Sequence, residues 1–264
     1  MLDTAEGLEV LRDIEAQHQL FHRHVLELAG DSDRIILCDT GLYGSTHRLL
    51  AAGDPSLPLE TILFARSNYK GFDEAHFPKV VGLMVDRRAY NPLDNAASVL
   101  RFWQLIEGLF EPRIPSVRTF VEDPEGRVVG NCGDIRFGHL DPTTGNPFMI
   151  GALAYVDQLS AGGGRALMRD TLVALRRLRA AITYPTTRDV AVLDVGERSR
   201  DFGHLDAIGV MDMKPSRSLA SRLDALRKAN WREGAITSNF PVSRILLLPV
   251  VDAIQTYRGL AKCL

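Results

Sequence analysis

The chain has 264 residues, of which 45% are hydrophobic and 24% are charged. This composition excludes a disordered chain and predicts one globular domain over 1–264. Because 31 basic residues oppose 33 acidic ones, we expect neither nucleic acid nor an anionic membrane as a partner. No segment approaches the roughly 20 apolar residues of a membrane span. Three widely separated cysteines indicate a reducing cytoplasm.

The first part of the chain predicts a long helix followed by a βαβ unit. Apolar residues recur at helical spacing over 4–29, and Gly30 ends the pattern. The apolar runs 34–38 and 61–65 predict adjacent parallel strands, buried on both faces and joined by a helix over 45–52. We expect the first helix to pack on this sheet. We also expect Cys38, inside the first run, to be a core residue.

The rest of the chain alternates helical and strand patterns. Asp123-Pro124-Glu125-Gly126 predicts the turn of an antiparallel hairpin. Further strands are predicted at 80–85, 190–194 and 207–211. Further helices are predicted at 96–111, 147–160 and 165–181, from Ser216 to about 229, and in the tail 242–262. The predicted fold is α/β and Rossmann-like in its layers, with a mostly parallel sheet, an antiparallel hairpin and flanking helices. The N-terminal helix 1–30 and the helical segment 214–264 pack on its core.

The loop between the first strand and its helix carries the main functional signal. Asp39 ends the strand, and ligands of open α/β sheets bind outside the carboxyl ends of the strands. Gly41 and Gly44 allow close approach of a ligand to the backbone. Amides near Ser45 and Thr46 open the following helix and can bind a phosphate. The alternative is that Asp39-Thr40-Gly41 forms only a tight turn with an Asx-type hydrogen bond.

This strand, acid and Gly/Thr loop resembles the phosphoribosyl-pyrophosphate loop of type I phosphoribosyltransferases. In one register, Asp39 falls on the second acid of the family's strand-end pair and Gly44-Ser45-Thr46 on its phosphate cradle, while Cys38 replaces the first acid. In the other register, Asp39-Thr40-Gly41 resembles the Asp-Thr-Gly of the hypoxanthine-guanine branch, whose Asp lies near the base. The acidic pair then falls on Ile35 and Ile36. The resemblance covers about residues 34–52.

The resemblance implies a transferase acting at the sugar carbon of a phosphorylated ribose or nucleotide, assisted by Mg²⁺. Asp39 would bind ribose hydroxyls or the base, with Thr40 and Gly41 beside it in the loop. Asp194 also ends a predicted strand, so it could converge with Asp39 as a second catalytic carboxylate and metal ligand. The alternative is that Asp194 caps a loop.

The segment after the second strand gathers further candidate ligand-binding side chains. Arg66, Ser67, Asn68 and Lys70 lie where a phosphorylated substrate would extend, unless they form a solvated loop. Asp39 with Ser67-Asn68 also resembles haloacid-dehalogenase-like phosphatases. That resemblance implies Asp39 as the nucleophile, with Ser67 and a lysine such as Lys70 or Lys79 holding the phosphate.

Two further interpretations stay open. The chain could be a non-catalytic nucleotide-binding module, and it could form a homodimer. His18 and His22 share a helical face, but without further ligand signals they are expected to be surface residues.

Overall fold

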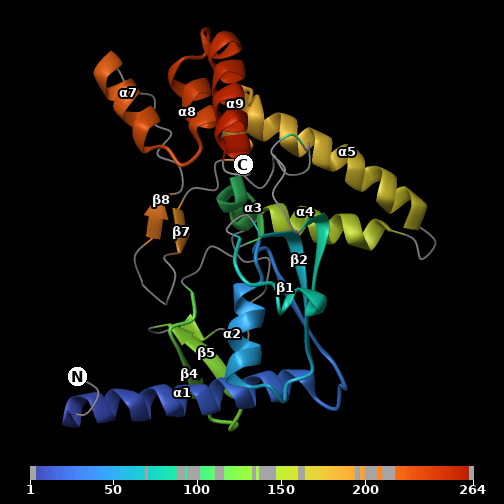
Figure 1. Ribbon diagram of the computed structural model, residues 1–264, viewed down its shortest axis with the longest axis vertical. Coiled ribbons are helices and arrows are strands. Elements are labelled where there is room, and N and C mark those ends of the chain that lie inside the picture. The colour runs from blue at the N-terminus through green and yellow to red at the C-terminus, as the bar shows by residue number, and fades with distance from the viewer. Residues whose placement is uncertain are drawn as a thin grey trace.

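The computed structural model describes residues 4–68, 71–87, 93, 102–110, 116–132, 135–136, 147–159, 164–193, 197–199, 207–209 and 218–261. Figure 1 shows a long first helix across one end, a parallel sheet in the middle and a group of helices at the other end. The predicted α/β class is confirmed, with a parallel sheet, an antiparallel hairpin and flanking helices.

The central sheet has three parallel strands, β1 (Ile35–Asp39), β2 (Leu59–Ser67) and β3 (Val80–Arg87), in that order. Helix α2 (Ser45–Gly53) connects β1 to β2, and the short 3-10 helix η1 (Phe77–Lys79) precedes β3. The register pairs Asp39 with Leu63 and Ser67 with Arg87. The prediction of adjacent parallel strands at 34–38 and 61–65 is therefore confirmed.

Strand β1 corrects the expectation of a strand buried on both faces. Among the described strands it pairs with β2 alone, and its residues alternate between half-buried and exposed. Cys38, predicted to be a core residue, is exposed. Ile36 is exposed on the same side of the strand. The reason is position, because β1 is an edge strand while the apolar composition of the run is that of a central one.

A second sheet is antiparallel, with β4 (Thr119–Glu122), β5 (Val128–Cys132) and β6 (Ile135–Arg136). The predicted turn joins β4 to β5, and Gly126 there has a φ of 78°, which glycine adopts without strain. Asp123 holds the turn by accepting hydrogen bonds from the Glu125 and Arg127 amides. The hairpin prediction is therefore confirmed.

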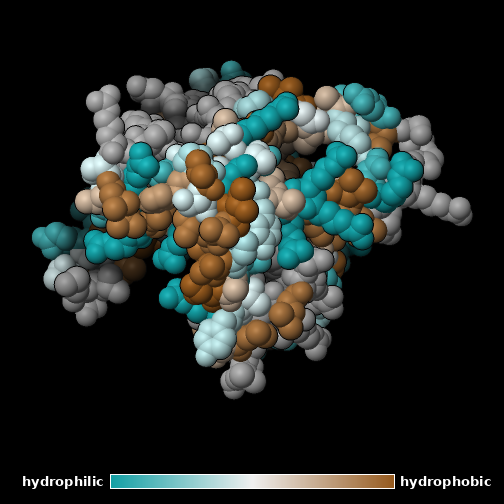
Figure 2. Space-filling model, turned by 90° about the horizontal axis from the view of Figure 1, so that it is seen from above, coloured by the Kyte–Doolittle hydropathy of each residue, from teal (hydrophilic) through white to brown (hydrophobic). Residues whose placement is uncertain are grey.

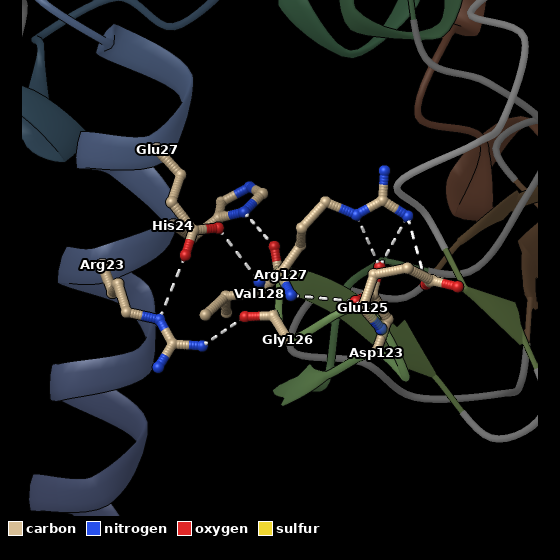
Figure 3. A network of polar contacts seen from close by, with 8 residues as sticks. All are labelled: Arg23, His24, Glu27, Asp123, Glu125, Gly126, Arg127 and Val128. Atoms are coloured by element: carbon tan, nitrogen blue, oxygen red, sulfur yellow. Dashed lines mark hydrogen bonds and ion pairs between the residues drawn. The ribbon is translucent and has the colours of Figure 1, made fainter.

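Helix α1 (Ala5–Ala29) begins after its capping residue Thr4 and ends before Gly30, as predicted. It packs on β4 and β5 rather than on the parallel sheet that follows it. His24 Nδ1 donates to the Val128 carbonyl at 2.7 Å, and the Val128 amide donates to Glu27 at 3.0 Å (Figure 3). Gln17 bonds both the amide and the carbonyl of Phe120. Polar side chains of the helix thus bind the hairpin backbone directly.

The remaining elements form the helical end of the molecule. They are α3 (Trp103–Phe110), α4 (Pro147–Gln158), α5 (Gly164–Thr183), α6 (Thr187–Leu193), α7 (Leu219–Lys228), α8 (Arg232–Asn239) and α9 (Arg244–Ala261), with a small antiparallel pair, β7 (Glu197–Ser199) and β8 (Ala207–Gly209). Their core is built around Trp231, whose ring nitrogen donates to the Ile182 carbonyl at 2.9 Å. Phe64 of β2 packs against this core, so the sheet and the helices are joined by apolar contact.

Two local predictions in this half are wrong. The run 190–194 was expected to be a buried strand, but α6 occupies it up to Leu193. Thr186 and Asp189 exchange hydrogen bonds with each other's backbone amides, a capping box that starts the helix. Helix α7 is capped by Ser218 rather than by Ser216, because the Ser218 hydroxyl accepts from the Ser221 amide.

Candidate functional site

The candidate site begins where β1 ends. Asp39 is half-buried there, and its carboxylate accepts from the Gly41 amide at 3.0 Å and from the Thr46 hydroxyl at 3.2 Å. Both partners belong to the predicted loop, so the Asx-type turn is present. A carboxylate oxygen can accept more than one hydrogen bond, and Thr46 is exposed. The turn therefore leaves Asp39 acceptor capacity for a hydroxyl of a ligand.

Helix α2 starts directly above this carboxylate without a side-chain cap. Its capping residue is Gly44, with a φ of 75° in the left-handed region, and a glycine has no side chain with which to cap the first-turn amides. Ser45 and Thr46, the first two helical residues, are exposed. The first amides of a helix have no partner within it, so this end offers hydrogen-bond donors to an anion.

Gly44 has a second constraint besides its backbone angle. A Cβ atom on it would lie 3.3 Å from both methyl carbons of Val80 and 3.4 Å from Cδ2 of His76. The side chains of Val80 and His76 thus already fill the space beside this glycine. A larger side chain at Gly44 would first disturb the fold, whatever binds at the amides.

Two buried histidines, His47 and His76, lie beside the loop. His47 of α2 bonds the Thr61 hydroxyl of β2 at 2.9 Å, and His76 Nε2 donates to the Tyr43 carbonyl at 2.7 Å. The two rings stack with centroids 6.3 Å apart. Burial, followed by the nearby His76 and Lys79, lowers the pKa of His47 from its ordinary value. Sequence analysis missed these residues, because no local pattern places 47, 61 and 76 together.

The end of β2 is a separate place from the end of β1. Asp39 is level with Leu63, so Ser67 lies four residues farther along β2, about 13 Å at strand spacing. The Ser67 amide donates to the Leu42 carbonyl at 2.7 Å, and its side chain is fully buried. The structure therefore does not bring the Ser67 hydroxyl and Asp39 together as a phosphatase site would require.

Arg66 is engaged in holding β3 to β2. Its guanidinium forms an ion pair with Asp86 and donates to the carbonyls of Phe77 at 2.9 Å and Val80 at 2.6 Å. It also lies over the Phe77 ring, 4.9 Å from the centroid. Predicted to bind substrate, this side chain instead has internal partners for its charge.

Asn68 is likewise used within the fold. Its side-chain amide bonds the backbone of Phe72 in both directions and donates to Glu74 at 2.9 Å. The bonds shape the turn after β2. Two other predicted residues, Lys70 and Asp194, lie outside the described residues, although the strand that was to place Asp194 is a helix up to Leu193.

A magnesium ion finds few ligands around Asp39. Within the described ranges, no group of three or more His, Cys, Asp or Glu side chains is placed to hold a metal. The carboxylate of Asp86, on β3, is paired with Arg66. The described residues around Asp39 therefore do not fit a Mg²⁺ ion held by protein side chains.

The chain matches no protein-family model, no curated protein and no solved structure. Across the described part of the chain, every helix falls short of the length or apolar character that crossing a membrane requires. The geometry of the site is therefore what a functional proposal rests on.

Proposed function

We propose that the chain is a transferase acting at the sugar carbon of a phosphorylated ribose or nucleotide, bound at the loop 39–46. The phosphate accepts hydrogen bonds from the first-turn amides of α2, among them those of Ser45 and Thr46, and from the Ser45 hydroxyl. Asp39 accepts a hydrogen bond from a sugar hydroxyl. The observation that carries this proposal is the uncapped start of α2 beside the Asp39–Thr46 pair.

The pairing of an anion site with a carboxylate is what favours a sugar phosphate. Amides and a helix N-terminus attract the phosphate, whereas a carboxylate repels it and suits a neutral hydroxyl. A ligand carrying both groups satisfies both ends of the loop. In the reaction, the bond from the sugar carbon to its pyrophosphate leaving group breaks, and a bond to the acceptor's nucleophilic atom forms. The loop's part is to bind and orient the sugar.

The binding test uses 5-phosphoribosyl 1-pyrophosphate and titration calorimetry. We expect wild-type protein to bind it and Asp39→Asn to weaken the affinity roughly tenfold or more, because a charged acceptor is lost. Asp33→Asn is the matched control, since this exposed acid lies just before β1 at the opposite end of the strand. Thermal melting of each variant checks that the fold is intact. Equal affinities of wild type and Asp39→Asn would contradict the proposal.

The activity test adds a panel of nucleobases and measures pyrophosphate release. Release that depends on a base supports transfer. Two outcomes would overturn it: phosphate release with a trappable aspartyl-phosphate indicates a phosphohydrolase, and binding without turnover indicates a nucleotide-binding module.

A further inference from the structure

Helix α9 has one face that is fully used by the fold. Leu248 is buried, and Arg244 donates to the Pro185 carbonyl at 2.8 Å. Asp252 accepts from the Tyr184 hydroxyl at 2.9 Å, and Gln255 donates to Glu233 at 2.9 Å. These positions recur every three or four residues, so they form one stripe that docks the helix on the rest of the helical end.

The opposite face of α9 is apolar and open to water. Five large apolar side chains of the helix lie there, each more than a third exposed: Leu246, Val250, Ile254, Tyr257 and Leu260. Figure 2 looks down on this end of the molecule and shows apolar side chains at its surface between hydrophilic ones. Among the described residues of this face, Arg258 is the one with a charge.

The size of this exposed apolar face indicates that a partner covers it. Exposed apolar patches beyond a few hundred Å² are rare on monomers. The exposed surface of these five side chains, together with that of Val242 and Ile245 at the start of the helix, is of the same order as the roughly 800 Å² that each partner gives to a stable interface.

We propose that this face is the interface of a homodimer in which α9 packs against α9 of a second copy. Leu246, Val250, Ala253, Tyr257 and Leu260 follow one another at intervals of four, three, four and three residues. That is the spacing of a seam between two packed helices. A two-fold axis across the helix makes the pair antiparallel, with the two helix dipoles opposed. Leu246 then faces Tyr257 of the second copy, and Val250 faces Ala253.

The charges around the face argue against other occupants. A helix that lies on an anionic membrane carries several Lys or Arg along its polar side. Here Arg244 is bound to Pro185 within the fold, which leaves Arg258 as the exposed cation of α9. A highly charged protein partner would likewise meet a face with a single charge. A second copy matches this face in both hydrophobicity and length.

The test compares two leucines of equal exposure by sedimentation velocity over a range of protein concentrations. Leu246 on α9 is 76% exposed, and Leu28 on α1 is 75% exposed. We expect wild type and Leu28→Glu to sediment as dimers, at twice the chain mass of 29.2 kDa, and Leu246→Glu as a monomer that still melts cooperatively. A monomeric wild type, or a dimeric Leu246→Glu, would overturn the proposal. So would a monomeric wild type that floats with phosphatidylcholine vesicles, which would indicate a lipid surface.

A second variant pair tests the arrangement and guards against misfolding. Tyr257→Lys alone should also give a monomer. The double variant Leu246→Glu with Tyr257→Lys places opposite charges face to face twice in an antiparallel pair, so we expect it to regain dimer. A double variant that melts cooperatively yet stays monomeric at every concentration would exclude this antiparallel contact.

Discussion

The ends of β1 and β2 carry similar polar residues and use them in opposite ways. At the end of β2, the side chains of Arg66 and Asn68 donate hydrogen bonds to nearby backbone carbonyls and to acidic side chains within the fold. At the end of β1, the Asp39 carboxylate accepts hydrogen bonds from its own loop, and Ser45 and Thr46 are exposed. A polar residue at a strand end is therefore a functional candidate only where its partners leave it capacity for a ligand.

The largest expected effect is on stability at the β2–β3 contact. A Cβ on Gly82 would lie 2.0 Å from the Val85 carbonyl oxygen and 2.7 Å from the Arg66 amide nitrogen. Because both are backbone atoms, we expect Gly82→Ala to cost about 3 kcal/mol or more of unfolding free energy, measured by urea denaturation. Gly53→Ala is the control, since its nearest neighbour is 4.0 Å away and a helix favours alanine. A Gly82→Ala protein as stable as wild type would contradict this packing.

The next effect tests whether Arg66, at the end of β2, serves stability rather than ligand binding. Arg66→Met leaves Asp86 without its ion pair and two carbonyls without a donor, so we expect a loss of about 2–4 kcal/mol. At a temperature where the variant is folded, its affinity for the sugar phosphate should match wild type. Arg48→Met, on the exposed side of α2, should change stability by less than about 0.5 kcal/mol. Loss of binding in a folded Arg66→Met protein would place Arg66 in the ligand site after all.

A smaller effect depends on pH and tests the buried His47 beside the loop. The pKa of His47 is lower in the folded protein than its ordinary value of 6.5, because burial disfavours the charged ring. Below pH 6.5 the unfolded chain therefore binds a proton that the folded protein does not. Stability should fall as the pH drops from 6.5, by at most about 1.4 kcal/mol per pH unit for this group.

His47→Gln should flatten that part of the pH profile of the unfolding free energy, whereas His18→Gln, on the exposed face of α1, should leave it unchanged. The same slope in His47→Gln and wild type would assign the dependence to another group.

The smallest expected effect is at the rim of the loop. Ser45→Ala removes one exposed hydroxyl, so affinity for the sugar phosphate should fall by about 0.5–1.5 kcal/mol, less than for Asp39→Asn. Ser32→Ala, before β1 at the far end of the strand, is the calorimetric control. An unchanged affinity would leave the amides as the sole donors.

The contrast also shows what the sequence can predict. The strands around α2 were predicted correctly because apolar runs and a glycine turn are local signals. The exposure of Cys38 was not predicted, because it depends on which strands lie next to β1 in the sheet. Helix α6 was predicted as a strand because its run is short and apolar and its two valines favour extended structure, while its capping box determines the start of a helix. The contacts that occupy Arg66 follow from the packing of β3 on β2, whereas those of Asn68 are made within its own turn.

The double hydrogen bond between Gln17 and Phe120 has a consequence for folding kinetics. The two residues are 103 positions apart, so the bond forms only after a long stretch of chain has been closed into a loop. Contacts of such high sequence separation form slowly, and helices attached by them can open without global unfolding. The amide hydrogen of Phe120 exchanges with solvent only when Gln17 releases it. Its exchange rate therefore measures how often α1 leaves the hairpin.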